Sequence, residues 1–401
     1  MSSVLFTWEL GAGLGHIGRL RPLAESLAAR GHQVYFAMRD LTHSQEVFAG
    51  TSIACLQAPF KIEPPTAPIA VPRSLPHILH NVGFSNPSEL SGLVAAWRTL
   101  LMLTKPDVVV IDHSPSALVA LRGHPAKKVI VGTGFFIPPK AVPLPDLRPW
   151  LPPAAEQLAS DEARILETIN HVMERHGQPA LGSVSDLYSE VDDQVLLTFP
   201  ELDHYGVRPY RKYWGTWDSS WGMAPEWPAG NGPRVFGYLK PFRALPEVLT
   251  QLLRRALPTI VYAPSLSRLA RAKFAGPTLR FVEQSQDLKQ IRETCDLAIL
   301  NATHGVAVEL LLGGVPALHF PLMLEQLLLG RKFEDSQTGM LADCESPEQV
   351  EFSLNRFLHA TEIKQGASDF ARRYSFLDSK KQAELLGEHL HRLLDSDVKS
   401  R

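Results

Sequence analysis

The stretch DLAILNATHGVAVELLLGGVPALHFPLMLEQ, residues 296–326, alternates strand-like and helix-like runs. Its first apolar run is expected to end as a strand at Asn301, and a helix is expected to begin near Val306 after a short turn. A second strand-like run ends before Pro321, where a polar loop begins. Strands joined by single helices of this length indicate right-handed crossovers and a parallel sheet. The stretch therefore predicts the doubly wound α/β class.

The same alternation extends on both sides of this stretch. RVFGYL, TIVYAPS and TLRFVEQ are predicted strands, and so are VLFTW, HQVYFAM, KPDVVVID and KKVIVGTGFF in the first third of the chain. Residues between these halves are rich in Trp, Gly and Pro and lack periodicity, which indicates a linker. We expect an N-terminal domain at 1–212, this linker at 213–233, a C-terminal domain at 234–375 and a closing helix at 376–401 that packs back toward the N-terminal domain.

Residues 296–326 also carry polar groups whose positions suit a sugar nucleotide. Exposed amides at a helix start, with the positive end of the helix dipole, favour a diphosphate. Glu309, about one turn into that helix, is placed to accept hydrogen bonds from a ribose diol, and Glu325 with Gln326 to bond adjacent sugar hydroxyls. Plainer interpretations stay open, because Glu309 can be a solvated helix residue and the other two a helix N-terminal pair.

This block resembles the donor-binding signature of GT-B glycosyltransferases, in particular the family that glycosylates small lipophilic acceptors of macrolide or flavonoid type from UDP- or dTDP-sugars. That signature runs from His or Arg through a small-residue turn to Glu eight positions later, then Gly-Val-Pro, then Pro-x-x-x-(Asp/Glu)-Gln. At these positions the chain has, without a gap, Asn301, Glu309, Gly314-Val315-Pro316, and Pro321 with Glu325-Gln326. The resemblance implies two Rossmann-like domains that face a cleft, the N-terminal one for the acceptor and the C-terminal one for the nucleotide sugar.

The chain departs from the family at the diphosphate. The family's histidine falls on Asn301, whereas His304 stands three positions later and either reaches the phosphates or braces the loop. Thr303 replaces a glycine, and its hydroxyl can donate to a phosphate. The family's aromatic residue for the base has no clear counterpart after TLRFVEQ, so the nucleotide stays open. The donor site implied by the resemblance consists of Asn301, Thr303, His304, Gly305, Val306, Glu309, Glu325 and Gln326.

A second glycine-rich turn follows the first predicted strand. ELGAGLGHIGRL, at residues 9–20, has the G-x-G-x-x-G spacing of a dinucleotide-binding turn, given by Gly13, Gly15 and Gly18. The end of the next strand offers Asp40 for a ribose or Arg39 for a phosphorylated ribose. A dinucleotide-dependent oxidoreductase is therefore an alternative, although it leaves the C-terminal block unexplained.

The glycosyltransferase family gives this turn another role. Its catalytic base occupies the position of His16, and the aspartate that assists the base occupies that of Asp112, at the end of DVVVID. The resemblance implies an inverting transfer in which His16 removes the acceptor proton while Asp112 stabilises the imidazolium. A structural histidine in a helix N-terminal turn and an acid that caps the Ser114 turn are the alternatives. GLGHIGRL also resembles lipid-intermediate glycosyltransferases of cell-wall synthesis and a related sugar-nucleotide hydrolase, so the acceptor stays open.

Alternative functions on the same fold are a sugar-nucleotide hydrolase or epimerase. A non-catalytic sugar-nucleotide-binding protein is a further interpretation.

No metal and no cofactor besides the sugar nucleotide is expected. His113, and the pair of His77 and His80, have no third metal ligand near them in sequence. An Asp-x-Asp motif for a metal occurs only at 395–397, in the terminal tail.

Composition limits the class of partner and the compartment. At 401 residues the chain is long enough for two domains. A net charge of -2 gives no electrostatic reason to expect a nucleic-acid partner. The three cysteines form no C-x-x-C pair, which fits a reducing compartment. Because no signal peptide or membrane-length apolar run is visible, we expect a cytoplasmic protein, with peripheral contact at a membrane left open.

Overall fold

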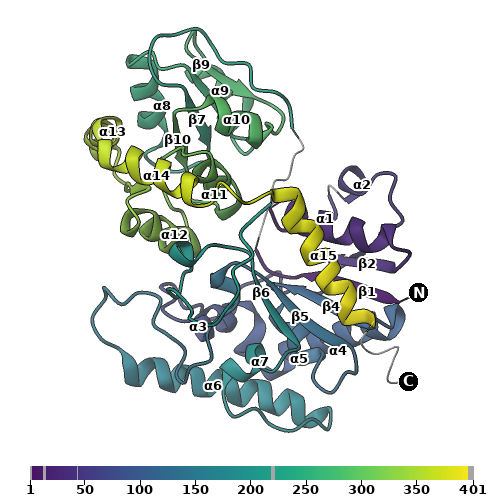
Figure 1. Ribbon diagram of the computed structural model, residues 1–401. Coiled ribbons are helices and arrows are strands. Elements are labelled where there is room, and N and C mark those ends of the chain that lie inside the picture. The colour runs from purple at the N-terminus through teal and green to yellow at the C-terminus, as the bar shows by residue number, and fades with distance from the viewer. Residues whose placement is uncertain (1, 12–14, 43, 218–221, 396–401) are drawn as a thin grey trace. The chain divides into compact units, whose positions relative to one another are not determined.

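The computed structural model describes residues 2–11, 15–42, 44–217 and 222–395. The chain forms two compact units, each drawn from more than one segment (Figure 1). The first unit consists of the described residues within Met1–Phe199, Val207–Trp214 and Ala383–Arg401. The second consists of those within Pro200–Gly206 and Gly215–Gln382.

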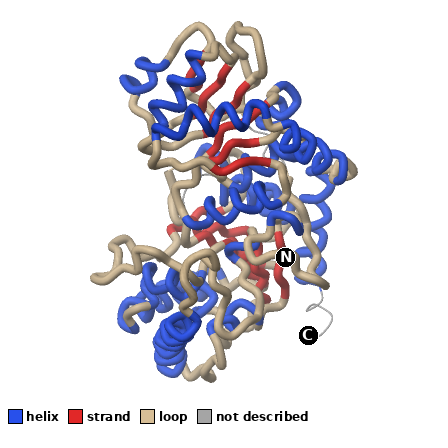
Figure 2. The backbone as a smooth tube through the Cα atoms, turned by 90° about the vertical axis from the view of Figure 1, so that its left-hand side faces the viewer, coloured by secondary structure: helices blue, strands red, loops and turns tan. Residues whose placement is uncertain are grey.

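The first unit contains a parallel six-stranded sheet in the order β3-β2-β1-β4-β5-β6, drawn in red in Figure 2. Its strands are β1 (Ser3–Trp8), β2 (Gln33–Met38), β3 (Ala54–Gln57), β4 (Val108–Asp112), β5 (Lys127–Gly132) and β6 (Asp193–Leu196). Every residue of β4 is buried, as expected for a central parallel strand covered on both faces. The strand order reverses between β1 and β4, and ligands of doubly wound folds bind where the loops after two such strands meet.

Helices connect these strands, and local sequence explains where they begin. In α4, Asn86 accepts a hydrogen bond from the amide of Ser88, and Pro87 occupies the first helical position, where its missing N–H costs nothing. The helices of this unit are α1 (Gly15–Ala29), α2 (Ser44–Val47), α3 (Leu75–Leu79), the π-helical turn η1 (His80–Phe84), α4 (Pro87–Thr104), α5 (Pro115–Ala120), the 3-10 turn η2 (Gly134–Phe136), α6 (Ala155–Arg175), α7 (Val184–Ser189) and α15 (Ser379–Asp395).

Most of helix α15, from Ala383 on, belongs to the first unit, although the second unit precedes it in the chain (Figure 1). Leu386 and Leu390 are fully buried. Nε2 of His389 lies 2.5 Å from Oδ2 of Asp193, and the Lys127 ammonium donates to the Leu393 carbonyl at 2.8 Å. Asp193 and Lys127 begin their strands, so these contacts lie at the amino edge of the sheet.

The second unit repeats the architecture with the order β12-β11-β10-β7-β8-β9, all parallel. Its strands are β7 (Val235–Tyr238), β8 (Thr259–Tyr262), β9 (Leu279–Val282), β10 (Leu297–Leu300), β11 (Ala317–His319) and β12 (Gly339–Leu341). Its helices are η3 (Pro200–Leu202), α8 (Leu245–Arg254), α9 (Arg268–Phe274), α10 (Leu288–Thr294), α11 (His304–Leu312), α12 (Leu324–Asp335), η4 (Pro347–Gln349), α13 (Val350–His359) and α14 (Thr361–Arg373). Here the order reverses between β10 and β7.

The prediction of two Rossmann-like units with doubly wound parallel sheets is confirmed. One boundary differs slightly, because α11 begins at His304 and not near Val306. Ala302 adopts a left-handed conformation with φ 54°, which turns the chain into the helix two residues earlier than the apolar pattern indicates. Among the described helices, none is both long and apolar enough to cross a membrane.

Candidate functional site

His16 and Asp112 meet where the strand order of the first sheet reverses. Asp112 ends β4 and pairs in register with Trp8, which ends β1. His16 follows in the first turn of α1. Its Nδ1 atom lies 2.7 Å from Oδ2 of Asp112, and both side chains are buried. The structure thus brings together the two residues that the resemblance assigns to a base and its partner.

Aromatic side chains fix the imidazole of His16. Trp8 stacks on the ring with centroids 5.2 Å apart, and the ring of Phe136 lies at 5.5 Å. With Nδ1 bonded to Asp112, the second nitrogen, Nε2, faces Gly11, where an added Cβ would lie 2.5 Å from it. When Nδ1 carries the proton, Nε2 is the basic nitrogen of the ring. The arrangement suits the acceptance of a proton from a bound hydroxyl.

The glycines of this turn differ in role. Gly13 lies outside the described residues. Gly15 begins α1 with open space where a Cβ would stand, and Gly18 is buried within the same helix. Gly11, with φ +91°, is the glycine whose missing side chain leaves room beside Nε2 of His16. The sequence interpretation missed Gly11, since it stands outside the G-x-G-x-x-G spacing.

His113, which follows Asp112, is a neutral side chain near the ring of His16. It has a left-handed backbone, with φ 44°, and its ring lies 4.1 Å from that of Phe136. Burial, together with the nearby charge of His16, lowers the pKa of His113 to about 3. At neutral pH this residue therefore adds aromatic surface beside the His16 and Asp112 pair.

The other histidines considered for a metal site have separate partners. Nε2 of His77 lies 3.0 Å from Oδ2 of Asp161, and Nε2 of His80 lies 3.0 Å from the carbonyl of Ala67. Within the part of the chain that the structure describes, no three His, Cys, Asp or Glu residues gather as a metal-binding group.

Asn301 occupies the reversal point of the second sheet. Its Oδ1 accepts a hydrogen bond from the amide of Lys240 at 2.7 Å, and its Nδ2 donates to the carbonyl of Phe320 at 2.8 Å. These partners follow β7 and β11, so the buried side chain of Asn301 joins the segments after three strands. Its contact with a diphosphate stays a prediction.

Replacing Asn301 by Ala should lower the free energy of unfolding by about 2–3 kcal/mol, because a buried carbonyl and a partly buried amide lose their partner. Urea denaturation of the full chain measures the change. Asn355→Ala is the control, since exposed Asn355 accepts a hydrogen bond from Arg255 at the surface. A loss at Asn301 no larger than at Asn355 would contradict the structural role.

The start of α11 presents the backbone amides predicted for the diphosphate. Thr303 occupies the N-cap position of this helix. Among the described residues, its side chain makes no capping hydrogen bond. His304 is buried in the first turn, and Gly305 has open space where a Cβ would stand. Val306 follows as a half-buried residue. First-turn amides have no partner within a helix, and the dipole favours negative charge there.

Glu309 is buried, which excludes the interpretation of a solvated helix residue. Its Oε1 accepts a hydrogen bond from Nη1 of Arg292 at 2.5 Å, from the neighbouring helix α10. A ribose diol would share this carboxylate with the guanidinium. The sequence interpretation missed Arg292, because a basic residue on a short amphipathic helix is usually a surface residue. Glu309 itself indicated that a basic partner must exist, since a carboxylate on an apolar helix requires one.

Glu325 and Gln326 lie in the first turn of α12, after the Pro321 loop. Gln326 is buried, and its Oε1 accepts a hydrogen bond from the amide of Leu322 at 2.8 Å, which fixes that loop. Glu325 is half-buried. The polar pair therefore combines a loop-fixing amide with a carboxylate nearer the surface, and its contact with a sugar stays a prediction.

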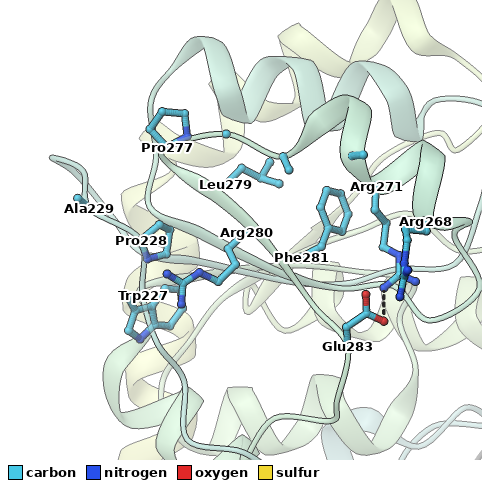
Figure 3. Close-up of a pocket in the computed structure, with 13 residues that line it drawn as sticks. Trp227, Pro228, Ala229, Arg268, Arg271, Pro277, Leu279, Arg280, Phe281 and Glu283 are labelled. Atoms are coloured by element: carbon cyan, nitrogen blue, oxygen red, sulfur yellow. Dashed lines mark ion pairs between the residues drawn. The ribbon is translucent and has the colours of Figure 1, made fainter.

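A hollow of about 580 Å³ lies elsewhere in the second unit, beside β9 and α9 (Figure 3). Leu279 and Phe281 line it, and the ion pair of Arg271 with Glu283, 2.8 Å apart, closes one side. None of the residues predicted for the donor or the acceptor lines this hollow. We assign it no role in the predicted chemistry.

Comparison with known proteins supports the architecture. No family model and no curated protein matches the sequence. Among solved structures, glycosyltransferase VinC in complex with dTDP superposes with a TM-score of 0.69 at 16% identity, over 98% of this chain and 99% of that one. The chain has the GT-B fold.

Further GT-B structures resemble the chain over nearly its whole length. SnogD from Streptomyces nogalater has a TM-score of 0.60 at 19% identity, covering 96% of this chain and 99% of SnogD. The spinosyn rhamnosyltransferase SpnG, complexed with thymidine diphosphate, has a TM-score of 0.64 at 17% identity, covering 96% and 100%. SpnG has also been solved with spinosyn aglycone.

Proposed function

We propose that the chain is a glycosyltransferase that moves a sugar from a nucleoside-diphosphate sugar to a hydroxyl of a small or lipid-like acceptor, with inversion at the anomeric carbon. The observation that carries the proposal is the buried pair of His16 Nδ1 and Asp112 Oδ2, 2.7 Å apart at the strand-order reversal. Solved structures of the same fold include glycosyltransferases bound to dTDP and to an aglycone.

In the proposed reaction Nε2 of His16 takes the proton of the acceptor hydroxyl as its oxygen attacks the anomeric carbon. Asp112 keeps Nδ1 protonated and stabilises the imidazolium that forms. The bond between the sugar and the diphosphate breaks on the opposite face. The amides at the start of α11, with Thr303, then stabilise the departing negative charge. We propose no metal in this step and a cytoplasmic location for the protein.

The oxidoreductase alternative receives less support. Nη1 of Arg39 donates to the carbonyl of Glu9 at 3.0 Å, and its guanidinium lies 4.2 Å above the ring of Phe60. Asp40 accepts hydrogen bonds from the amide and the hydroxyl of Thr42. Both side chains offered for a cofactor ribose are thus engaged with the protein.

The test incubates the full chain with UDP- and dTDP-sugars, with and without a macrolide or flavonoid aglycone, and follows free nucleotide, free sugar and glycoside by mass spectrometry. We expect nucleotide release that depends on the aglycone and matches glycoside formation. Release of free sugar at the same rate without aglycone would show that the protein is a hydrolase and not a transferase. A thermal-shift screen accompanies it, because a nucleotide at a hundred times its Kd adds about 2.7 kcal/mol of stability. The absence of any shift would reject the donor site.

Replacing Gly11 by Ala should lower kcat of transfer at least about tenfold, because the methyl group would stand in contact with Nε2 of His16. The measurement is the initial rate at saturating donor and acceptor. Gly31→Ala is a matched control, since Gly31 has a similar φ of +83° but open space around a Cβ. Both variants place an alanine at a left-handed φ, so the backbone strain is of the same kind. Equal rates in the two variants would show that the space beside Nε2 is not needed.

A further inference from the structure

Glu9 is a buried carboxylate beside the proposed base that the reaction above does not use. It directly follows β1 and has no exposed surface. Its Oε2 accepts a hydrogen bond from the amide of Ser116 at 3.0 Å. The next residue, Leu10, donates its amide to the carbonyl of His113 at 3.0 Å. Two hydrogen bonds therefore attach residues 9 and 10 to the turn that follows Asp112.

That turn requires tertiary support. His113 has φ 44°, a left-handed conformation that is unfavourable for an L-residue and persists only where neighbouring groups hold it. The hydroxyl of Ser114 donates to the carbonyl of Asp112 at 3.0 Å, so the turn is bonded at its start to the backbone of Asp112. At its other end the Glu9 carboxylate holds Ser116. A shift of this turn would move Asp112 relative to Nδ1 of His16.

Burial makes the charge of Glu9 responsive near neutral pH. It raises the pKa of Glu9 to about 7, although hydrogen bonds from Ser116 and Ala117 and the charge of Arg39 lower it. Other titratable groups around the turn are His16 on α1, Asp112 at the end of β4 and His113 directly after it. An ionised carboxylate accepts a hydrogen bond from a backbone amide more strongly than a neutral acid does.

We propose that Glu9 is a positioning residue, which holds the turn from Asp112 to Ser116 against the end of β1 and thereby fixes Asp112 at Nδ1 of His16. The inference rests on the proposed function for its kinetic consequence. Its structural content, the dependence of the His16 environment on Glu9, does not require that function.

The kinetic test compares Glu9→Ala with Glu9→Gln. The alanine variant leaves the amide of Ser116 without its partner, so kcat should fall at least tenfold while KM for the donor stays within twofold. Glutamine keeps the shape and an oxygen for Ser116, so it should recover most of the lost rate. It should also weaken the dependence of kcat on pH near 7, because the amide does not ionise as the Glu9 carboxyl does. An alanine variant within twofold of wild type would overturn the proposal.

Glu162 provides a matched control in the same unit. It is also buried, and its Oε2 accepts a hydrogen bond from a backbone amide, that of Leu144, at 2.6 Å. Glu162→Ala should lower stability comparably and leave kcat within threefold of wild type. Equal losses of kcat in Glu9→Ala and Glu162→Ala would show that Glu9 only stabilises the fold, and would overturn the proposal.

A second measurement separates this proposal from the proposed function. The Hε1 resonance of His16 in the full chain, assigned by its loss in His16→Ala, reports the ring environment without any substrate. At pH 8 it should move in Glu9→Ala and stay near its wild-type position in Glu9→Gln and Glu162→Ala. An unmoved resonance in Glu9→Ala would overturn the positioning role. A moved resonance in a protein without transferase activity would keep that role and reject the transferase.

Discussion

Replacement of His16 by alanine is expected to lower kcat of sugar transfer by about 10²–10⁴-fold, the usual contribution of a general base. Binding of dTDP should be unchanged, because the residues predicted for the donor belong to the second unit. Initial rates at saturating substrates measure the first effect, and calorimetric titration with dTDP measures the second. Asp112→Asn should also lower kcat strongly, since an amide in place of the carboxylate does not stabilise the imidazolium.

A second histidine and aspartate pair, with a buried histidine and a half-buried aspartate, provides the control. His77 and Asp161 lie 3.0 Å apart in the same unit, and His77 is buried to a similar degree as His16. His77→Ala should therefore cause a comparable loss of packing without removing the base. If the two alanine variants lose the same fraction of activity, or if His16→Ala stays within fivefold of wild type, His16 is not the base.

The second large effect concerns acid stability and arises at His319. This residue ends β11 without exposed surface, and its ring meets Phe333 edge to face with centroids 4.5 Å apart. Among the described residues, neither ring nitrogen has a hydrogen-bond partner. Burial lowers the pKa of His319 to about 3.

The unfolded chain therefore binds a proton at His319 near pH 6.5, whereas the folded chain binds it only near pH 3. Stability contributed by the neutral ring is complete above pH 6.5 and is lost as the pH falls toward 3. The loss is about 1.4 kcal/mol per pH unit, or roughly 2 kcal/mol between pH 6.5 and 5. His319→Leu should remove this part of the pH dependence, as measured by urea denaturation at pH 5 and pH 7.

His359→Leu is the comparison, because His359 is exposed on α13. That variant should keep the wild-type difference between pH 5 and pH 7. His113, which is also buried and neutral, should make the first unit acid-sensitive in the same sense. A His319→Leu protein with the full wild-type difference would contradict the assignment.

The alternation of apolar strands and amphipathic helices was enough to predict the fold, because it is a local pattern. Residues 296–326 gave the strand before Asn301 and the helix after it, with an error of two residues at the helix start. That error arose from the left-handed Ala302, a conformation that alanine does not signal in a sequence.

The site was less accessible to sequence reasoning, because its contacts are distant in the chain. His16 and Asp112 were paired through a family resemblance and not through spacing, as 96 positions separate them. The partner of Glu9 is Ser116, and that of Asn301 is Lys240, 61 positions away. The resemblance named the reacting groups, whereas residues that only hold them in place leave no motif.

The assignment of α15 to the first unit has a consequence for how the protein is made. Residues 215–382 interrupt the sequence of the first unit. During synthesis, the chain of the second unit leaves the ribosome in full before Leu386 and Leu390, which complete the core of the first. The unit that begins first is thus the last to be completed. A nascent chain halted before Ala383 is expected to lack the contacts of α15 with Lys127 and Asp193 at the amino edge of the first sheet.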